Sequence, residues 1–377
     1  MIVGGAQENT LLTIKGHLKK GHQVTLVTGP DEGREGKLLQ FTGIPDFPVV
    51  MMPELCRELA PWRDLCAFVK LVRLFRRNRY DVVHTHSSKA GIIGRLAARF
   101  CGIPVIVHTV HGQAFTPYEK AWRNFIYILS EKIAAKCCHK IYAVARAMID
   151  QCVKAKIAPE KKYMVVYSGM DTDSFDRAEA DPVLRESLQI PPGVKVIATL
   201  ARLFPQKGYE FIPDAFALAV RKMPDLHLLI IGDGIMRESI AAKFAELGVA
   251  DKVSFAGLVA PAQIPSYLAL SDMLWHLSLR EGLPRAAVQA LASGKPVIGF
   301  RLDGTPEVVI DNVTGFCFEP GDNAGVADAA VKILSDPGLC RQMGANGKKL
   351  VLENFHWQKM ADILEKEYLQ LFELAKR

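Results

Sequence analysis

The sequence predicts an α/β protein made of two parallel sheets, each covered by helices. Short apolar runs alternate with longer helical patterns along the 377 residues, as they do in consecutive βα units. The alternation stops in a polar stretch at 176–181, followed by prolines and a glycine at 191–193, and then begins again. We therefore expect two Rossmann-like domains, over 1–178 and 190–355, with a helix at 357–377 that returns to the first domain.

Strands and helices follow one another closely in the first domain. Short apolar runs predict strands at 23–27, 48–52, 81–85, 105–109, 140–144 and 163–167. Helical patterns separate them at 8–19, 65–77, 90–100, 119–136 and 147–155.

The start of this domain departs from the usual pattern. A doubly wound domain opens with a strand whose carboxyl end leads into the first Gly-rich turn. Here Gly4-Gly5 follows Met1-Ile2-Val3 directly, which is too little chain for a full strand. We expect the first N-terminal strand to be truncated, and we favour a late start of the sequence over the loss of a central strand.

The second domain repeats the same kind of unit and ends in helices. Strands are predicted at 194–200, 226–231, 253–255, 273–277 and 296–300. Helices are predicted at 209–221, 237–247, 264–270, 285–292, 324–335, 339–354 and 357–375.

Composition excludes several classes of protein. Hydrophobic residues make up 49% of the chain, which supports a large core and argues against disorder. No apolar run approaches the ~20 residues of a membrane helix, and the N-terminus does not resemble a secretory signal. The eight cysteines show no metal-ligand spacing and indicate a reducing compartment. We expect a cytoplasmic protein, peripheral on the inner face of the cell membrane.

Charge is unevenly distributed along the chain. Residues 1–180 carry 26 Lys/Arg and 17 Asp/Glu, whereas residues 181–377 carry 21 and 23. A basic first half fits an anionic partner, such as a membrane surface or a phosphorylated acceptor, but ordinary soluble domains carry similar charge. The stretch 65–79 combines an apolar face with Lys and Arg elsewhere. It fits an anionic membrane surface or, the interpretation we favour, a core-facing helix with a solvated basic side.

One stretch, residues 278–307, organises the second domain. It places Glu281 before the helix predicted at 285–292, continues into the strand predicted at 296–300, and reaches a second Gly-rich turn at 303–307 that we expect to open another helix. Helix N-termini present free N–H groups and a partial positive charge, which suit phosphate and sugar oxygens. The pattern therefore predicts the donor site of a sugar-transferring enzyme.

Two cations belong to a strand-to-helix turn that follows the first strand of this domain. Arg202 and Lys207 can clamp a diphosphate, the first as a fork and the second as a point charge. The alternative is a pair of surface cations on a loop.

Three further polar residues are open to two interpretations. Glu281 and Glu307 can accept hydrogen bonds from sugar hydroxyls, or can simply be acids that favour a helix N-terminus. Gln289, about two turns after Glu281, points either at a ligand or at solvent.

Histidines end two predicted strands of the first domain. His111 lies beside Gly112 at a strand's carboxyl end, where ligands bind in open α/β sheets, and we favour a functional role. For His84 we favour a buried strand histidine. His84, His86 and His111 share no metal-ligand spacing with a carboxylate, so we expect no metal. Neither Gly4-Gly5 nor 231–234 matches GxGxxG, which gives a nicotinamide site little support.

These motifs together identify a family. The chain resembles the retaining glycosyltransferases of family 4, which have the two-domain GT-B fold. The resemblance rests, in the expected order, on GGAQENTL, DVVHTHSSKAGIIGRLAA, HTVHG, SGMDTDSF, ARLFPQKG, IGDG, EGLPRAAVQALASGKPVI and DGTPEVV. It implies two facing domains with a cleft between them, a nucleotide-sugar donor held mainly by the second domain, and a C-terminal helix that crosses back to the first.

The resemblance also implies roles for single residues of the second domain. Arg202 and Lys207 would bind the diphosphate, and Glu281 would contact the donor sugar with help from the backbone of 282–284. Gln289 stands where the family usually has a second Glu, which holds the nucleotide ribose. The residues proposed for donor binding in this domain are Arg202, Lys207, Gly257, Leu258, Glu281, Gly282, Leu283, Pro284 and Gln289.

Two residues of the first domain complete the implied site. His111 would contact the transferred sugar, and Gly5 would lie near the phosphates and the acceptor. Of the donor-binding residues of the second domain, Gly257 and Leu258 would lie near the base.

We therefore expect a metal-independent retaining glycosyltransferase without a cofactor, and Glu281, His111, Arg202 and Lys207 as its catalytic residues. Its partners would be a UDP-sugar donor and a glycan or lipid-linked acceptor of cell-envelope polysaccharide, with peripheral contact to an anionic membrane and no nucleic acid. The alternatives are a nucleotide-sugar epimerase or sugar phosphorylase on the same fold, and a non-catalytic homologue that binds nucleotide sugars.

Overall fold

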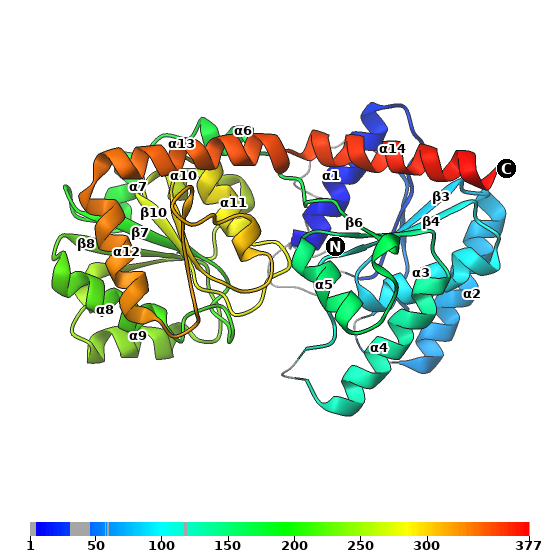
Figure 1. Cartoon of the computed structure of the whole chain (residues 1–377), viewed down its shortest axis with the longest axis horizontal. Helices are drawn as coiled ribbons and strands as arrows, with labels where there is room; N and C mark the ends of the chain where they lie inside the picture. Colours follow the sequence, from blue (N-terminus) through cyan, green and yellow to red (C-terminus); the bar gives the residue numbers. More distant parts are fainter. Residues whose placement is uncertain (1–4, 31–45, 57, 59, 117–118, 377) are drawn as a thin grey trace. The chain divides into compact units, whose positions relative to one another are not determined.

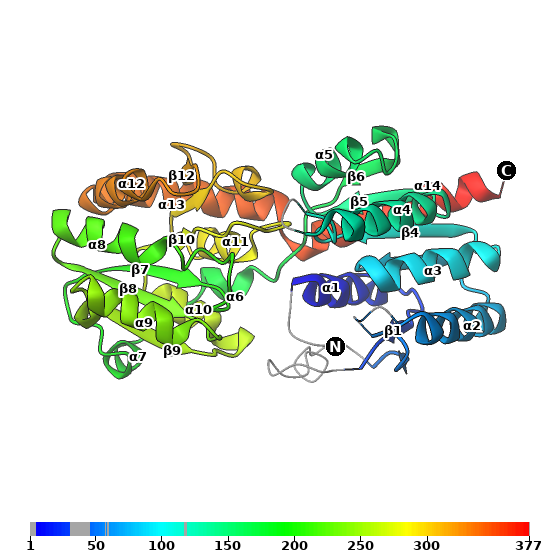
Figure 2. The ribbon, with the colours of Figure 1, turned by 90° about the horizontal axis from the view of Figure 1, so that it is seen from below.

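The computed structural model describes residues 5–30, 46–56, 58, 60–116 and 119–376. It divides into two compact units, which are described separately below. The first unit consists of Met1–Met170 with Trp357–Arg377, and the second of Asp171–His356. Each is a parallel α/β unit (Figures 1 and 2). These findings establish the α/β class that the alternating sequence pattern predicts.

The first unit contains a four-stranded parallel sheet in the order β3-β4-β5-β6. Its strands are β3 (Val82–His86), β4 (Val105–Val110), β5 (Lys140–Ala143) and β6 (Tyr163–Val165). Its helices are α1 (Gly5–Lys19), α2 (Pro61–Asn78), α3 (Ser88–Phe100), α4 (Ala121–Lys136), α5 (Arg146–Lys154) and α14 (Trp357–Ala375), with the 3₁₀ helix η2 (Glu160–Lys162).

Strand β4 is buried on both faces, and its alternate side chains enter two different cores. Val105 and Val107 pack with Met360 and Leu364 of α14, whereas Ile106 packs in the core that α2, α3 and α5 share. The period of two along a strand produces this division. Helix α14 also lies beside α1 (Figure 1), so close that a Cβ on Gly16 would stand 2.3 Å from the Cβ of Ala361.

Strands β1 (Leu26–Thr28) and β2 (Val49–Met51) form a separate two-stranded parallel sheet. Within the described ranges neither of them is hydrogen-bonded to β3. Gly5 already belongs to α1. The expectation of a truncated first strand concerns residues that lie outside the described ones. Gly4 also lies outside them.

Helix α2 turns most of its apolar face toward the core. Leu71, Val72 and Phe75 are buried, while Leu65 is 52% exposed. The core-facing interpretation of this helix is therefore confirmed for the residues that dominate its apolar face.

The second unit contains a six-stranded parallel sheet in the order β12-β11-β10-β7-β8-β9. The strands are β7 (Lys195–Leu200), β8 (Leu226–Ile231), β9 (Val253–Gly257), β10 (Met273–His276), β11 (Val297–Phe300) and β12 (Gly315–Phe318). Its helices are α6 (Asp173–Asp176), α7 (Pro182–Ser187), α8 (Ile212–Lys222), α9 (Arg237–Glu246), α10 (Ile264–Ala269), α11 (Arg285–Ala292), α12 (Asn323–Ser335) and α13 (Pro337–Asn354).

Short 3₁₀ turns connect several of these elements, namely η3 (Ala250–Lys252), η4 (Pro261–Gln263) and η5 (Thr305–Glu307). One face of the sheet packs against α8, α9 and α12, where Phe216, Phe244 and Ile333 share a core with strand residues such as Trp275. None of the described helices in either unit is both long and apolar enough to cross a bilayer.

Candidate functional site

The site begins at the point where the order in which the chain adds strands to the second sheet reverses. After β7 the chain builds β8 and β9 on one side, and β10, β11 and β12 are added on the other. Strands β7 and β10 are therefore parallel neighbours, and the chain leaves them toward opposite edges of the sheet. Ligands of open α/β sheets bind outside the carboxyl ends of strands at such a switch point. The loop with Arg202 and Lys207 follows β7, and the loop with Glu281 follows β10.

Hydrogen bonds and one glycine hold these two loops together. The Leu279 N–H donates to the Gln206 carbonyl at 2.9 Å, and the Ser278 hydroxyl donates to the same carbonyl at 3.1 Å. Gly208 has a φ of +93°, and a Cβ there would stand 2.5 Å from the Leu277 carbonyl oxygen. Only glycine fits this approach without displacing the backbone.

The sequence-predicted cation and acid meet across the two loops. The Lys207 ammonium lies 2.6 Å from a Glu281 carboxylate oxygen, and the two side chains are 24% and 23% exposed. The Glu281 N–H donates to the Asp303 carboxylate at 2.9 Å. Arg202 belongs to the same loop as Lys207 but is exposed, with its guanidinium 5.4 Å from the centroid of the Phe204 ring.

Helix α11 begins directly after the Glu281 loop. Leu283 and Pro284 are buried, and the helix starts at Arg285. The backbone of Gly282 leads into this end, where N–H groups are left without helical partners. Gln289 is half-buried on α11, and within the part of the chain that the structure describes its side-chain amide has no hydrogen-bonding partner. An amide in that position can both donate to and accept from a ligand.

The second Gly-rich turn does not open a helix, so that expectation is wrong. Residues 305–307 form only the 3₁₀ turn η5. The buried Val308 and Val309 follow it, and the chain then reaches β12. Asp303 has a φ of +48° and uses its carboxylate to hold the Glu281 loop. The site therefore has one α-helix N-terminus, that of α11, rather than two.

Glycines bring the ends of β7, β8 and β9 close together. A Cβ on Gly232 would stand 2.1 Å from the Ala201 carbonyl oxygen, and one on Gly234 would stand 2.4 Å from that of Leu203. The Gly232 N–H also donates to the Gly257 carbonyl at 2.9 Å. The glycines at 231–234 thus serve close packing of loops, and Leu258, after β9, is 60% exposed.

His276, which was not predicted from the sequence, lies buried at the end of β10 next to this site. Burial lowers the pKa of its imidazole, Glu281 raises it and Lys207 lowers it. The ring is therefore neutral near pH 7. The sequence signal that could have identified His276 is its position at the end of a predicted strand, just before the stretch 278–307. Asp303 was likewise missed as the partner of the Glu281 loop.

The first unit brings His86 and His111 together at the carboxyl ends of β3 and β4. Nδ1 of His86 and Nε2 of His111 are 2.9 Å apart, and the ring centroids are separated by 5.2 Å. Burial lowers the pKa of His86 to about 4, so this ring is neutral at pH 7. His84 uses both ring nitrogens inside the fold, one with the Thr109 hydroxyl at 2.7 Å and one with the Tyr368 hydroxyl, as expected of a structural histidine.

The predicted residues are thus distributed over both units. Gly5 and His111 belong to the first, and all the other predicted site residues belong to the second. Across the described residues, no three His, Cys, Asp or Glu side chains converge in a way that could hold a metal ion.

Comparisons with known proteins match both units. The family model for Glycosyltransferase Family 4 matches residues 3–174, and the model for Glycosyl transferases group 1 matches residues 181–350. An Escherichia coli relative, UDP-Gal:alpha-D-GlcNAc-diphosphoundecaprenol alpha-1,3-galactosyltransferase, is 29% identical over 324 residues, covering 85% of this chain and 83% of the relative. The Staphylococcus aureus capsular polysaccharide biosynthesis glycosyltransferase CapM is 27% identical over 364 residues, covering 93% and 90%.

The fold also matches solved structures. The crystal structure of the Anabaena protein HepE in complex with UDP superposes with a TM-score of 0.81 at 21% identity, covering 97% of this chain and 96% of that one. This likeness establishes the GT-B fold. Because the two family models together match nearly the whole chain, the protein belongs to the glycosyltransferases of family 4.

Proposed function

We propose that this glycosyltransferase moves a sugar, with retention of configuration, from a UDP-sugar to a glycan or lipid-linked acceptor of cell-envelope polysaccharide. The observation that carries the proposal is the Lys207–Glu281 pair at the switch point, beside the N-terminus of α11. The names of relatives support the donor and acceptor classes, since one specifies UDP-Gal and a diphosphoundecaprenol and another a capsular polysaccharide. The resemblance to retaining enzymes supports the proposal of retention.

The donor diphosphate fits the cationic side of the site. Lys207 neutralises Glu281 in the structure and can turn to a diphosphate oxygen when the donor enters. Arg202, on the same loop, adds a fork of N–H donors, and the amides at the start of α11 add a third source of positive potential. These groups can stabilise the leaving diphosphate, so we propose a reaction that needs no metal.

The sugar and nucleoside fit the remaining residues. Glu281 can accept hydrogen bonds from sugar hydroxyls, and Gln289 can bond the ribose hydroxyls with its amide. Gly257 and Leu258 lie near the base in this proposal. His111 contacts the transferred sugar, and Gly5 lies near the phosphates and the acceptor.

We propose front-face attack for the chemical step. The bond between the anomeric carbon and the diphosphate oxygen breaks through an oxocarbenium-like state, and the acceptor hydroxyl bonds to the same face of that carbon. Its proton passes to the departing diphosphate oxygen, which is the nearest base that the reaction itself creates. The enzyme's part is to stabilise the developing negative charge on the diphosphate.

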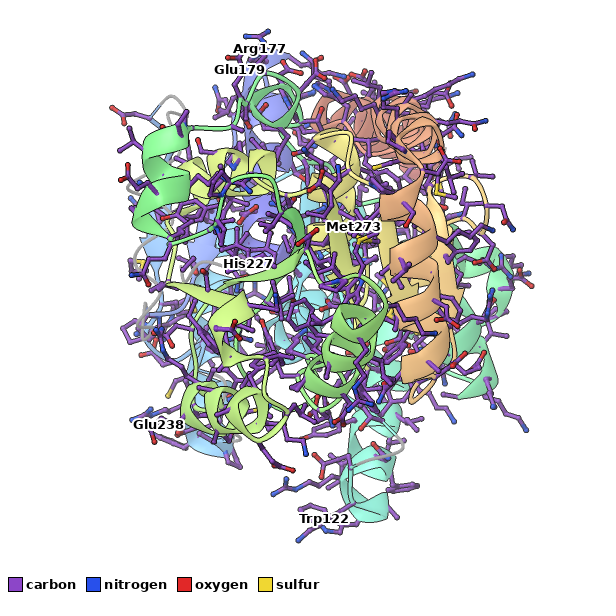
Figure 3. All side chains as sticks on the ribbon, turned by 90° about the vertical axis from the view of Figure 1, so that its left-hand side faces the viewer. Trp122, Arg177, Glu179, His227, Glu238 and Met273 are labelled. Atoms are coloured by element: carbon purple, nitrogen blue, oxygen red, sulfur yellow. The ribbon has the colours of Figure 1, made fainter. Side chains whose placement is uncertain are left out.

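A panel of UDP-sugars, scored by thermal shift and by release of UDP, tests this function. One donor should raise Tm and be hydrolysed slowly, with turnover unchanged by a chelator. Glu281→Ala should abolish both effects. The matched control is Glu238→Ala, because Glu238 is an exposed acid of α9 at the periphery of the same unit (Figure 3). Interconversion of donors would indicate an epimerase instead, and a product of inverted configuration would refute retention.

A further inference from the structure

Helix α4 presents its apolar side to solvent. Its large exposed side chains are Trp122 (56% exposed), Phe125 (67%), Ile126 (41%), Leu129 (45%) and Ile133 (49%). Spacings of three, four and seven residues place them on one stripe of the helix. Trp122 projects outward at the edge of the molecule (Figure 3). Single exposed hydrophobic residues are ordinary, but a continuous exposed stripe marks an interaction surface.

The opposite side of α4 packs Ile128 and Ala135 into the core and anchors the helix through two polar residues. The Asn124 amide donates to the Thr116 carbonyl at 2.7 Å and accepts from the Thr116 N–H at 3.0 Å. Arg95, fully buried on α3, forms an ion pair of 2.8 Å with Glu131. Turning the stripe inward would leave the Arg95 charge buried without its partner, which is strongly unfavourable. The outward orientation of the stripe is therefore fixed by the fold.

Positive charges flank the stripe. Lys120, Arg123, Lys132 and Lys136 lie on or next to the helix, and Lys120, Arg123 and Lys136 are exposed. The Arg123 guanidinium lies 5.3 Å from the centroid of the Trp122 ring. Two acids accompany these four cations: Glu131, which faces Arg95, and Glu119, just before the helix, which lies 3.5 Å from Arg123. An apolar stripe with aromatic residues and cationic flanks is the pattern of a helix that lies in a membrane interface.

We propose that α4 is an interfacial helix that inserts this stripe among the lipids of an anionic membrane. The surface thus differs from the apolar face of α2, whose Leu71, Val72 and Phe75 are buried. The inference deepens the proposed function, since a helix of this kind would hold the enzyme beside a lipid-linked acceptor. A second copy of the chain fits less well, because a two-fold contact would bring the same cations of both copies together.

Vesicle flotation without substrates tests the surface directly. The purified chain should float with vesicles of phosphatidylcholine and phosphatidylglycerol, and less with phosphatidylcholine alone, because anionic lipid attracts the flanking cations. Phe125→Glu combined with Leu129→Glu should lower the partition by about tenfold or more, since two large apolar side chains leave the interface. Both side chains are exposed, so the fold should be unaffected.

The matched control is Val183→Glu combined with Leu352→Glu, which adds the same two charges to exposed apolar positions of α7 and α13 in the second unit and should float like the native chain. Fluorescence gives an independent readout: vesicles should shift the emission to the blue, and Trp122→Phe should remove most of that shift.

Three outcomes would overturn the proposal: native protein that does not float, a double variant that floats as well as the native chain, or a native dimer that the double variant dissociates in light scattering. Release of UDP from a free donor separates this proposal from the enzymatic one. The double variant should retain that activity. If neither the native protein nor the double variant released UDP, the result would count against the proposed function alone.

Discussion

At the scale of single residues, Gln289 is where the proposed donor site departs from the family pattern. It occupies a half-buried position on α11, and within the described part of the chain its amide has no hydrogen-bonding partner. A carboxylate there would accept ribose hydrogen bonds with a full charge, which makes such bonds stronger.

Gln289→Glu should therefore lower the donor KM severalfold while kcat changes little, because the ribose is bound equally in ground and transition states. Steady-state release of UDP at varied donor concentration measures both constants. A collapse of kcat would show that this position takes part in the chemical step instead.

His86 is the second residue whose role can be tested alone. Its Nδ1 contacts Nε2 of His111 at 2.9 Å, and burial keeps its imidazole neutral at pH 7. If His111 contacts the transferred sugar as proposed, His86 is a positioning residue that selects the tautomer of His111.

His86→Asn should then lower kcat roughly tenfold or more with a smaller effect on donor KM, because misplaced groups cost most in the transition state. Nitrogen chemical shifts of labelled histidines should show a change in the tautomer of His111. Unchanged shifts together with unchanged kcat would remove His86 from the site.

At the scale of elements, the loop after β7 depends on one glycine. Gly208 combines a φ of +93° with a close approach to the loop after β10, since a Cβ there would stand 2.5 Å from the Leu277 carbonyl oxygen. Gly193 offers a matched comparison, because its φ is +80° but a Cβ there would meet nothing within 4 Å.

Gly208→Ala should reduce the free energy of unfolding by about 3 kcal/mol or more, and Gly193→Ala by only about 1–2 kcal/mol, because the latter meets left-handed strain alone. Urea unfolding of both variants makes the comparison. Equal losses in the two variants would mean that the contact with Leu277 relaxes at no cost.

Most elements can be predicted from periodicity, and the failures have local physical causes. Helices α11 and α14 and strand β8 have the predicted bounds. Strand β12 is not predicted because it is short and begins at a glycine, Gly315. A side chain has no room at this position, since a Cβ there would stand 1.7 Å from the Val297 carbonyl oxygen. The turn at 303–307 is wrongly predicted as a helix because its Gly-Thr-Pro-Glu resembles a helix start.

The site is predictable in its residues but not in its contacts. Lys207 and Glu281 each follow a strand, which the sequence indicates, but their contact depends on β7 pairing with β10. In the same way, the period of α4 reveals an amphipathic helix without saying which side faces the core. The buried Arg95, far away in the sequence, decides that by pairing with Glu131.

At the scale of the whole molecule, buried histidines make stability depend on pH. Burial lowers the pKa of His17, His86 and His227 to about 4, from the usual 6.5. Burial also lowers the pKa of His84, His108 and His276. Both units contain such residues, so neither should escape the effect.

Between about pH 6.5 and 4 the unfolded chain therefore binds more protons than the native one, and the free energy of unfolding falls as pH falls. At about pH 5 most Asp and Glu side chains remain charged in both states, so the histidines dominate the change. We expect a loss of about 2 kcal/mol or more between pH 7 and pH 5, measured by urea unfolding. His227→Gln should reduce this loss, and equal stability at the two pH values would contradict the prediction.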